Sequence, residues 1–352
     1  MVRAAGVTVV MWVRAYVQYL LRYISTAARG PWMARTKAEW LQLARARVLS
    51  VLERRLCCPM RMLEAKISEA GPGDKRPNPL SISEAVRELS GRGTVQVVPK
   101  RMANETPFYA PRGVVLMSKS FQELLAKRRH LYLLHKGLTE KDQFYGDVLE
   151  EIVDKALERS AVAKFKSRYP KQNLPAGRPL DFVVEVAGIQ WGGEVKNYRE
   201  WLYPQSWEIW AAISKCCELD VVPVLVTRKL PYISYRFFAK AGLVGYQTHF
   251  QFFHPAVAPE LERVKAVDGL GYKDIRCVLE PDVNLINLFQ ATLPKIGADF
   301  RRRFEKSRDL LRHFADGEKL GDRHLNPNVR TKKFMEAWRA IVGSELSEDQ
   351  QV

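Results

Sequence analysis

A short stretch in the middle of the chain combines alternating apolar residues with a turn signal, and it constrains the fold more than any other feature. Residues 178–196 read RPLDFVVEVAGIQWGGEVK. With Ala187-Gly188 as a two-residue turn, the numbers of cross-strand partners add to one constant value, so Asp181 lies opposite Glu194. Lys196 lies on the same face as Glu194, one strand period further along. The sequence therefore predicts a β-hairpin that brings two carboxylates and a lysine together.

The second face of this hairpin is apolar. It carries Phe182, Val184 and Val186 on the first strand and Ile189, Trp191 and Val195 on the second. We expect this face to pack on a core while the other face stays polar, as is common in antiparallel sheets.

The charged face is suited to metal chemistry. Carboxylates on neighbouring strands can hold a hard cation such as Mg²⁺, which takes oxygen ligands and keeps several waters and a phosphate oxygen. An ammonium beside the cation can hold or help deprotonate the attacking water, and it can offset the charge of a phosphodiester transition state. Asp181, Glu194 and Lys196 therefore suggest metal-assisted phosphodiester hydrolysis. The alternative is a solvated hairpin with ordinary surface ion pairs.

At these residues the chain resembles the PD-(D/E)xK nuclease superfamily, the restriction-endonuclease-like fold of restriction enzymes, Holliday-junction resolvases and repair nucleases. Pro179-Leu180-Asp181 is similar to the first half of its motif, with one residue inserted between Pro and Asp. Glu194-Val195-Lys196 is similar to the second half. The resemblance covers roughly residues 139–255, about a third of the chain.

The resemblance implies a mixed α/β fold with an α-β-β-β-α-β core. Asp181 and Glu194 would ligate Mg²⁺, for which Mn²⁺ would substitute, helped by the backbone carbonyl of Val195. Lys196 would orient or activate water. A Gln or Lys from the following helix often joins the site in relatives, which makes Gln205 and Lys215 weak candidates beside the reading as an ordinary polar helix face.

Many members of the superfamily also carry a Glu on the helix before the hairpin, and residues 145–150 (YGDVLE) are similar to that element. Apolar residues recur there at helical spacing, namely Val148, Leu149, Ile152, Val153, Ala156 and Leu157. Of the nearby acids, Glu150 lies closest to this apolar face, with Glu151 a near rival. We expect Glu150 to hold a second ion or to order the water shell of the first.

The order of elements matters more than the triplet itself, because Glu64-Ala65-Lys66 repeats the ExK pattern in a helical segment. After the hairpin, a helix beginning near Pro204 and a buried strand over 221–226 are predicted. One departure concerns residues 165–177, which are basic and contain two prolines that weaken the strand expected there. That strand is short or displaced, or the preceding helix ends early.

The charge of the chain points to a polyanionic partner. Its formal net charge is +17 with a pI near 9.7, which fits nucleic acid best and gives salt-dependent affinity. The five cysteines show no CxxC pair, which argues against a disulfide framework and a structural zinc site. We expect a reducing compartment, either cytoplasmic or nucleoid-associated.

Residues 1–38 form a basic, amphipathic segment. Arginines interrupt the apolar run from Val7 to Ile24, which argues against a membrane span. Three readings stay open: a membrane-surface or organelle-targeting helix, a helix docked on the domain, and upstream sequence included by an early start at Met1 rather than Met33.

Residues 39–112 are predicted to form three helices followed by a two-stranded ribbon. The third helix begins with a capping box, Ser81-Ile-Ser-Glu84, and can end at Gly91. This order resembles a winged helix-turn-helix domain, in which the third helix enters the major groove. The candidate DNA-binding residues are Arg87, Arg92, Lys100 and Arg101. A helical domain for protein contacts is the alternative.

Two further segments complete the predicted organisation. Residues 113–138 contain a basic linker helix that opens with Ser120-Phe-Gln-Glu123 and can stop at Gly137. The nuclease-like domain follows at 139–255, and residues 256–352 form a basic helical region. An arginine-rich helix over 298–314 is a solvated face or a clamp for a phosphate backbone.

The sequence thus favours a Mg²⁺-dependent DNA endonuclease with an N-terminal DNA-binding domain. Its substrate would be double-stranded or branched DNA, and it could act as a homodimer so that two sites meet two strands. A non-catalytic DNA-binding regulator with a nuclease fold is the first alternative. A nuclease acting on RNA is the second.

Overall fold

The computed structural model describes residues 36–68, 77–99, 106–116, 118–140, 146–160, 163–166, 180–266, 268–316 and 320–343. Lys37–Val352 is one compact unit, distinct from Met1–Thr36. The expectations for the N-terminal segment, Lys100, Arg101 and Pro179 lie outside the described residues. The fold belongs to the mixed α/β class, as predicted.

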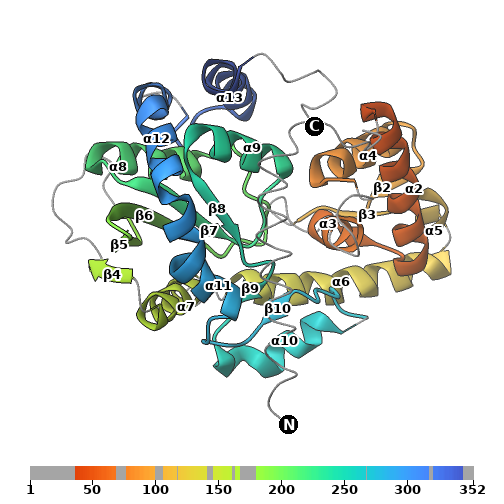
Figure 1. Ribbon diagram of the computed structural model, residues 1–352. Coiled ribbons are helices and arrows are strands. Elements are labelled where there is room, and N and C mark those ends of the chain that lie inside the picture. Colours follow the sequence, from red (N-terminus) through yellow and green to blue (C-terminus); the bar gives the residue numbers. More distant parts are fainter. Residues whose placement is uncertain are drawn as a thin grey trace, which may run out of the picture. The chain divides into compact units, whose positions relative to one another are not determined.

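The first part of the unit is a small helical module with a three-stranded sheet (Figure 1). Its elements are α2 (Lys37–Arg55), β1 (Cys58–Pro59), α3 (Met60–Ile67), α4 (Pro79–Gly91), β2 (Val95–Val97) and β3 (Phe108–Pro111). The strands are antiparallel in the order β1-β3-β2. The three predicted helices and the ribbon are present, while β1, with two residues, is too short to give a periodic signal.

Several helix boundaries differ from the sequence prediction; the helix expected from near Pro204, for example, begins at Trp207. Helix α4 begins at Pro79, because the side chain of Asn78 accepts a hydrogen bond from the Ser81 amide (2.8 Å) and proline favours the first helical turn. The capping box starting at Ser81 was therefore the wrong start. Helix α6 (Ser118–Glu140) runs past Gly137, whose cost of about 1 kcal/mol inside a helix is small enough for the rest of the helix to outweigh.

The core of this N-terminal module includes a later segment of the chain. Apolar side chains of α2, α3, α4 and α6 pack with side chains from α10 (Ala258–Lys265). They also pack with residues in or next to two parallel strands, β9 (Gln251–Phe252) and β10 (Ile275–Arg276). The later contributors are Phe253, Leu261, Val264, Leu270, Tyr272 and Ile275. Figure 1 shows α10 beside α6. Residues 256–275, assigned from sequence to the C-terminal region, thus pack into the N-terminal module.

The second part of the unit is built on a five-stranded sheet. Its strands are β4 (Ala163–Lys166), β5 (Phe182–Val186), β6 (Ile189–Lys196), β7 (Val222–Thr227) and β8 (Val244–Gln247), in that spatial order. The first three strands are antiparallel, and β6, β7 and β8 are parallel. The strand whose length and place were uncertain from the sequence, between residue 160 and the hairpin, is present as β4 and has four residues.

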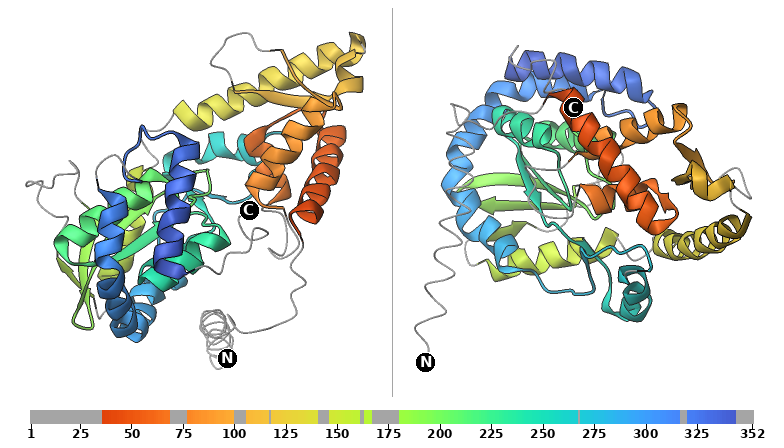
Figure 2. Two further views of the ribbon diagram at one scale, coloured as in Figure 1. Left: turned by 90° about the horizontal axis from the view of Figure 1, so that it is seen from above. Right: turned by 90° about the vertical axis from the view of Figure 1, so that its right-hand side faces the viewer.

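Helices cover both faces of this sheet (Figures 1 and 2). Helix α7 (Gly146–Arg159) lies on one face, and α8 (Trp207–Leu219) and α9 (Tyr232–Ala241) lie on the other. The six apolar residues predicted to face inward from α7 are all buried. The observed order α7-β4-β5-β6-α8-β7 matches the predicted α-β-β-β-α-β order.

The hairpin has the predicted register. Val186 pairs with Ile189, and Phe182 pairs with Gly193. The turn residues Ala187 and Gly188 both have positive φ (53° and 78°), the conformation of tight hairpin turns that match strand twist.

The prediction that one face of the hairpin stays polar is wrong in the middle of that face, at Val183 and Gly192. Val183 packs with Leu180, Cys216 and Val221 in a small core under α8. A Cβ atom at Gly192 would lie 2.5 Å from Val221 Cγ2, so this close approach requires glycine. The β-α-β crossover places a helix over this face, which sequence alternation alone does not reveal. The face stays polar at its open end and at the Glu185–Gln190 pair near the turn.

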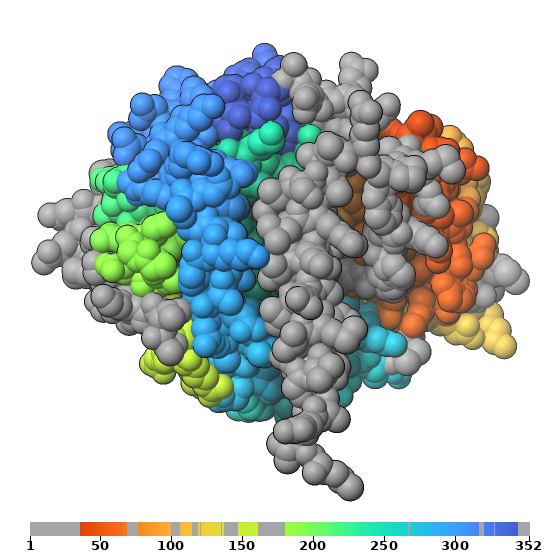
Figure 3. Space-filling model, viewed as in Figure 1, coloured from red at the N-terminus to blue at the C-terminus, as the bar shows by residue number. Residues whose placement is uncertain are grey.

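The C-terminal helices complete the core of the sheet domain. They are α11 (Val283–Asn287), the π-turn η4 (Leu288–Thr292), α12 (Leu293–Ala315) and α13 (Pro327–Val342). The short 3-10 helix η3 (Pro255–Val257) does not contribute to this core. Phe289 of η4 packs edge-on against Phe182, with ring centroids 5.9 Å apart. Figure 3 shows α12 forming much of the described surface of the sheet domain in that view.

Most of the arginines on α12 have intramolecular partners. Arg301 and Arg308 both bind the carboxylate of Asp220, at 2.7 and 2.6 Å. Arg302 and Arg303 both pair with Asp299, at 2.5 Å each. These pairs support the reading of this charge run as a solvated, partly structural face rather than a clamp for phosphate.

Candidate functional site

Four charged side chains meet at the carboxyl end of the parallel strands. Asp181 immediately precedes β5, Glu194 and Lys196 end β6, and Lys215 comes from α8. The hairpin register brings the first three together, since the Asp181 amide donates to the Gly193 carbonyl (3.0 Å) across the strand pair. The carboxyl edge of such strands is where open α/β sheets commonly bind ligands.

The ammonium of Lys196 lies among three oxygen atoms. Its Nζ donates to Glu194 Oε1 at 2.6 Å and to the Val195 carbonyl at 3.2 Å, and it lies 3.7 Å from Asp181 Oδ2. These are the three groups that the sequence analysis named as metal ligands. The hairpin thus directs two carboxylates and a carbonyl toward one positive charge.

Both carboxylates are largely shielded from water. Glu194 is 8% exposed, and its second oxygen, Oε2, accepts from the buried ammonium of Lys215 at 3.2 Å. Asp181 Oδ2 accepts from the Val195 amide at 2.6 Å. Lys215, a weak candidate from sequence, is therefore a direct partner of the site.

Burial and charge shift the pKa values in this group. Burial raises the pKa of Asp181, and the nearby charge of Glu194 raises it further, against the opposing effects of Lys196 and the Val195 amide. Burial alone would lower the pKa of Lys196, but Glu194 and Asp181 outweigh it and raise that pKa. Lys196 is therefore protonated, and its positive charge offsets part of the negative charge of the two carboxylates.

The donor set fits a divalent cation. Two carboxylates and a carbonyl are hard oxygen ligands of the kind that Mg²⁺ and Mn²⁺ prefer. Burial and then the charge of Glu194 raise the pKa of Asp181 more than Lys196 and Lys215 lower it, so the two lysines do not fully offset the cost of ionising this carboxyl. A cation held by Asp181, Glu194 and the Val195 carbonyl would supply that compensation.

The other predicted members are placed less tightly. Glu150 and its rival Glu151 are both half-buried on α7, and Glu151 pairs with Lys155 at 2.8 Å. No three His, Cys, Asp or Glu side chains in the described parts of the chain gather closely enough to hold a metal, so Glu150 does not complete such a group. Gln205 lies in the turn before α8, and no hydrogen bond found among the described residues joins it to the site.

Sequence reasoning missed two neighbours of the site. The pKa of Tyr198 responds to the charges of Lys196, Glu208, Glu194 and Asp181, after the larger effect of burial, which raises it. The residue is 40% exposed. Burial also raises the pKa of Glu208, opposed by Lys196. Glu208 lies seven residues before Lys215 and so shares its helix face, a spacing that could have revealed it.

The candidate DNA-binding residues of the N-terminal module differ in their surroundings. Arg87 is exposed on α4. Arg92, which caps that helix, lies 3.6 Å from Glu88 in an exposed ion pair of small energetic value. Both arginines are therefore exposed to solvent, and Arg92 also has an acidic partner.

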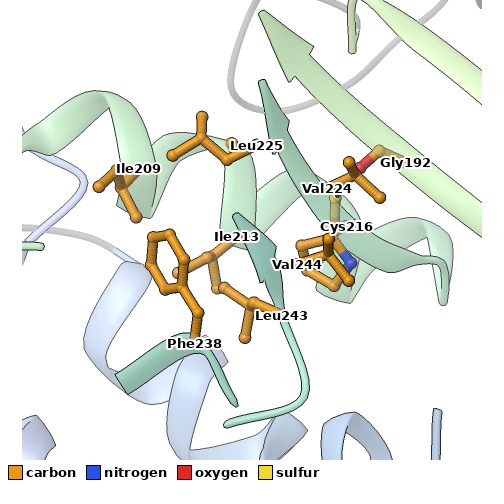
Figure 4. Close-up of a pocket in the computed structure, with 11 residues that line it drawn as sticks. Gly192, Ile209, Ile213, Cys216, Val224, Leu225, Phe238, Leu243 and Val244 are labelled. Carbon is orange, nitrogen blue, oxygen red and sulfur yellow. Dashed lines mark hydrogen bonds between the residues drawn. The ribbon is translucent and has the colours of Figure 1, made fainter. Parts of the chain in front are cut away.

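A cavity between α8 and β7 is a separate feature (Figure 4). Figure 4 shows Ile209, Ile213, Leu225 and Phe238 among the residues that line it, together with Cys216. The lining is almost wholly apolar and offers no oxygen side chain to a metal or a phosphate. The charged group at the strand ends, rather than this cavity, is the candidate functional site.

Within the described ranges, none of the helices has the length and apolar character needed to cross a membrane. Comparison of the chain with protein-family models, with curated protein sequences and with solved structures found no match. The geometry of the strand ends is therefore the basis for assigning a function.

Proposed function

We propose that this protein is a divalent-metal-dependent endonuclease that hydrolyses phosphodiester bonds in DNA. One observation carries the proposal: Asp181, Glu194 and the Val195 carbonyl all lie around the Lys196 ammonium at the open end of the hairpin. These are two acidic ligands, a carbonyl ligand and a basic group in one place. The order α7-β4-β5-β6-α8-β7 supports a restriction-endonuclease-like core around them.

Each residue of the site would have a different role in the proposed hydrolysis. Asp181 and Glu194, with the Val195 carbonyl, would hold the ion, which when bound would polarise a phosphate oxygen and lower the pKa of a bound water. Lys196 would turn toward that water and the phosphate, orienting the nucleophile and offsetting the negative charge of the transition state. Lys215 would keep Glu194 oriented through its bond to Oε2. Glu150 would order the outer water shell.

The N-terminal module would hold the substrate. Its order α2-β1-α3-α4-β2-β3, with sheet order β1-β3-β2, supports a winged-helix domain. In such domains the third helix, here α4, lies in the major groove, and Arg87 is exposed on it. The net charge of +17 would strengthen binding to any phosphate backbone. Duplex or branched DNA is therefore the proposed substrate.

A cleavage assay with the full-length protein tests this function. Plasmid, linear duplex, a branched junction, single-stranded DNA and RNA are each incubated with Mg²⁺ or Mn²⁺, and the parent is compared with Asp181→Ala and Lys196→Ala. We expect metal-dependent cleavage of DNA by the parent and its loss in both variants. Cleavage that both variants retain would place the site elsewhere, and cleavage of RNA alone would change the substrate.

A non-catalytic DNA-binding role is the second candidate, and one observation favours it. Each oxygen of Glu194 already binds an ammonium group, so much of its charge is compensated without a metal. A parent that binds duplex DNA but cuts none of the five substrates with either metal would support this role instead.

A further inference from the structure

The chain just beyond the site strand is fixed by side chains from elsewhere in the fold. The buried Asn197 exchanges two hydrogen bonds with the backbone of Phe252: its Nδ2 donates to the carbonyl at 2.7 Å, and its Oδ1 accepts from the amide at 3.0 Å. The carbonyls of Tyr198 and Arg199 both accept from the guanidinium of Arg228, at 3.2 Å for Tyr198. Three consecutive residues after β6 are therefore held in place.

A single carboxylate orients the two arginines in this network. Asp274 Oδ2 accepts from Arg228 Nη1 at 2.7 Å, and Asp274 Oδ1 accepts from Arg199 Nη1 at 2.8 Å. Arg228 is fully buried, and it follows directly after β7, the parallel neighbour of the site strand. Burial would raise the pKa of Asp274, but the two guanidinium charges hold that pKa below its ordinary value. Asp274 is therefore ionised.

Asp274 belongs to the segment that completes the core of the N-terminal module. Its neighbours Tyr272 and Ile275 are buried in that core. The guanidinium of Arg199 stacks on the ring of Tyr272, 4.0 Å from the ring centroid. A second contact is the ion pair between Glu200 and Arg61 on α3, at 2.7 Å. The strand that ends in Lys196 is thus joined to the N-terminal module at consecutive residues.

We infer that Asp274 is a positioning residue for the Glu194–Lys196 end of β6, acting through Arg228 and Arg199, and that the N-terminal module thereby sets the geometry of the site. The inference rests on the proposed nuclease function, because it concerns how the same site is held. A displacement of about 1 Å at reacting groups can reduce a rate by about 100-fold, so the rigidity of this strand end matters to catalysis.

Arg228→Lys is the mildest test. Lysine keeps the positive charge beside Asp274 but lacks the planar fork that reaches two carbonyls. Its matched control is Arg303→Lys, which removes a guanidinium bond to the Ala239 carbonyl (2.8 Å) on α9 from an arginine that, like Arg228, also pairs with an aspartate. We expect Arg228→Lys to lower the cleavage rate about 10- to 100-fold with little change in the Kd for DNA, and the control to cut like the parent.

A second variant separates positioning from folding. Arg199→Met, Arg228→Met and Asp274→Leu together replace the buried ionic cluster with apolar side chains, a change that can leave a protein as stable as before. Its melting temperature verifies the fold. We expect this variant to fold, to cut at least 10-fold more slowly than the parent, and to exchange the amide protons of Val195 to Tyr198 faster with deuterium.

The exchange measurement makes the two possible failures distinguishable. If the parent cuts no substrate but the triple variant still loses protection at the end of β6, the proposed function fails and the positioning role stands. If the parent cuts, and both Arg228→Lys and the folded triple variant cut at the parent rate with unchanged protection, Asp274 does not position the site. Loss of protection spread evenly over the sheet domain would also overturn the inference, because it would indicate general destabilisation.

Discussion

The triplet Glu-x-Lys occurs twice in this chain, once in a strand and once in a helix, and the two copies behave differently. On β6, residues two apart share a face, and Lys196 Nζ lies 2.6 Å from Glu194 Oε1. On α3, residues two apart point in different directions, so Glu64 pairs with Arg61 at 3.0 Å and Lys66 donates to the Gly271 carbonyl at 3.1 Å. The same three letters make a charged site only on an extended backbone.

The largest expected effect comes from removing the lysine of each triplet. Lys196→Ala should lower metal-dependent cleavage by about 100-fold or more, because the developing phosphate charge loses its nearby cation. Lys66→Ala should leave the cleavage rate within about twofold, since the hydrogen bond that Lys66 donates goes to the Gly271 carbonyl rather than to a carboxylate of the site. Single-turnover cleavage of a duplex measures both, and equal losses would end the distinction between the two copies.

Removing the acid of each triplet tests metal binding directly. Glu194→Gln should weaken Mn²⁺ binding by about 10-fold or more in calorimetry, because a charged oxygen ligand becomes neutral. Glu64→Gln should bind Mn²⁺ like the parent, since its carboxylate lies in the helical copy. Asp181→Asn should behave like Glu194→Gln. Unchanged Mn²⁺ affinity in Glu194→Gln would show that the strand copy holds no metal.

A smaller effect on the cleavage rate is expected from substitutions on α7. Either Glu150 or its neighbour Glu151 could be the third carboxylate of the site. Glu150→Gln should slow cleavage about 10-fold, as expected for an outer-shell group. Glu151→Gln breaks only the exposed pair with Lys155 and should change the rate by less than twofold. A reversed order of the two rates would move the third carboxylate to Glu151.

The smallest effect is the order in which the two lysines lose their protons in the metal-free protein. Burial lowers the pKa of Lys66, whereas Glu194 and Asp181 raise that of Lys196 despite its burial. A lowered pKa means that the folded state gains stability as pH rises between that pKa and 10.5. A raised pKa means stability that is present below 10.5 and is lost as pH rises through the folded pKa. NMR titration of the side-chain signals should therefore show Lys66 deprotonating first.

The hairpin could be predicted because its information is local. A two-residue turn fixes the pairing of every residue on both strands, which places Asp181, Glu194 and Lys196 without knowledge of the rest of the fold. The apolar face of α7 was equally readable from its periodicity. Within a regular helix or strand, the position of a residue in the sequence directly determines which face its side chain occupies.

Features that depend on distant packing could not be predicted in this way. Alternation along the hairpin suggested a polar face, but α8 returns over Val183 and Gly192 and buries them. Asp274 lies 93 residues after Asp181 in the printed sequence, and nothing local marks it as a partner of Arg199.

The packing of residues 253–275 into the N-terminal module also sets an order of folding. During synthesis, α2, α3 and α4 are complete long before Leu261, Tyr272 and Ile275 emerge, and these three belong to the same core. Strands β5 to β8 are made in the interval. The module that comes first in the chain can therefore finish folding only after the site strands exist. A fragment that ends at Glu140 would leave part of its apolar core open to solvent.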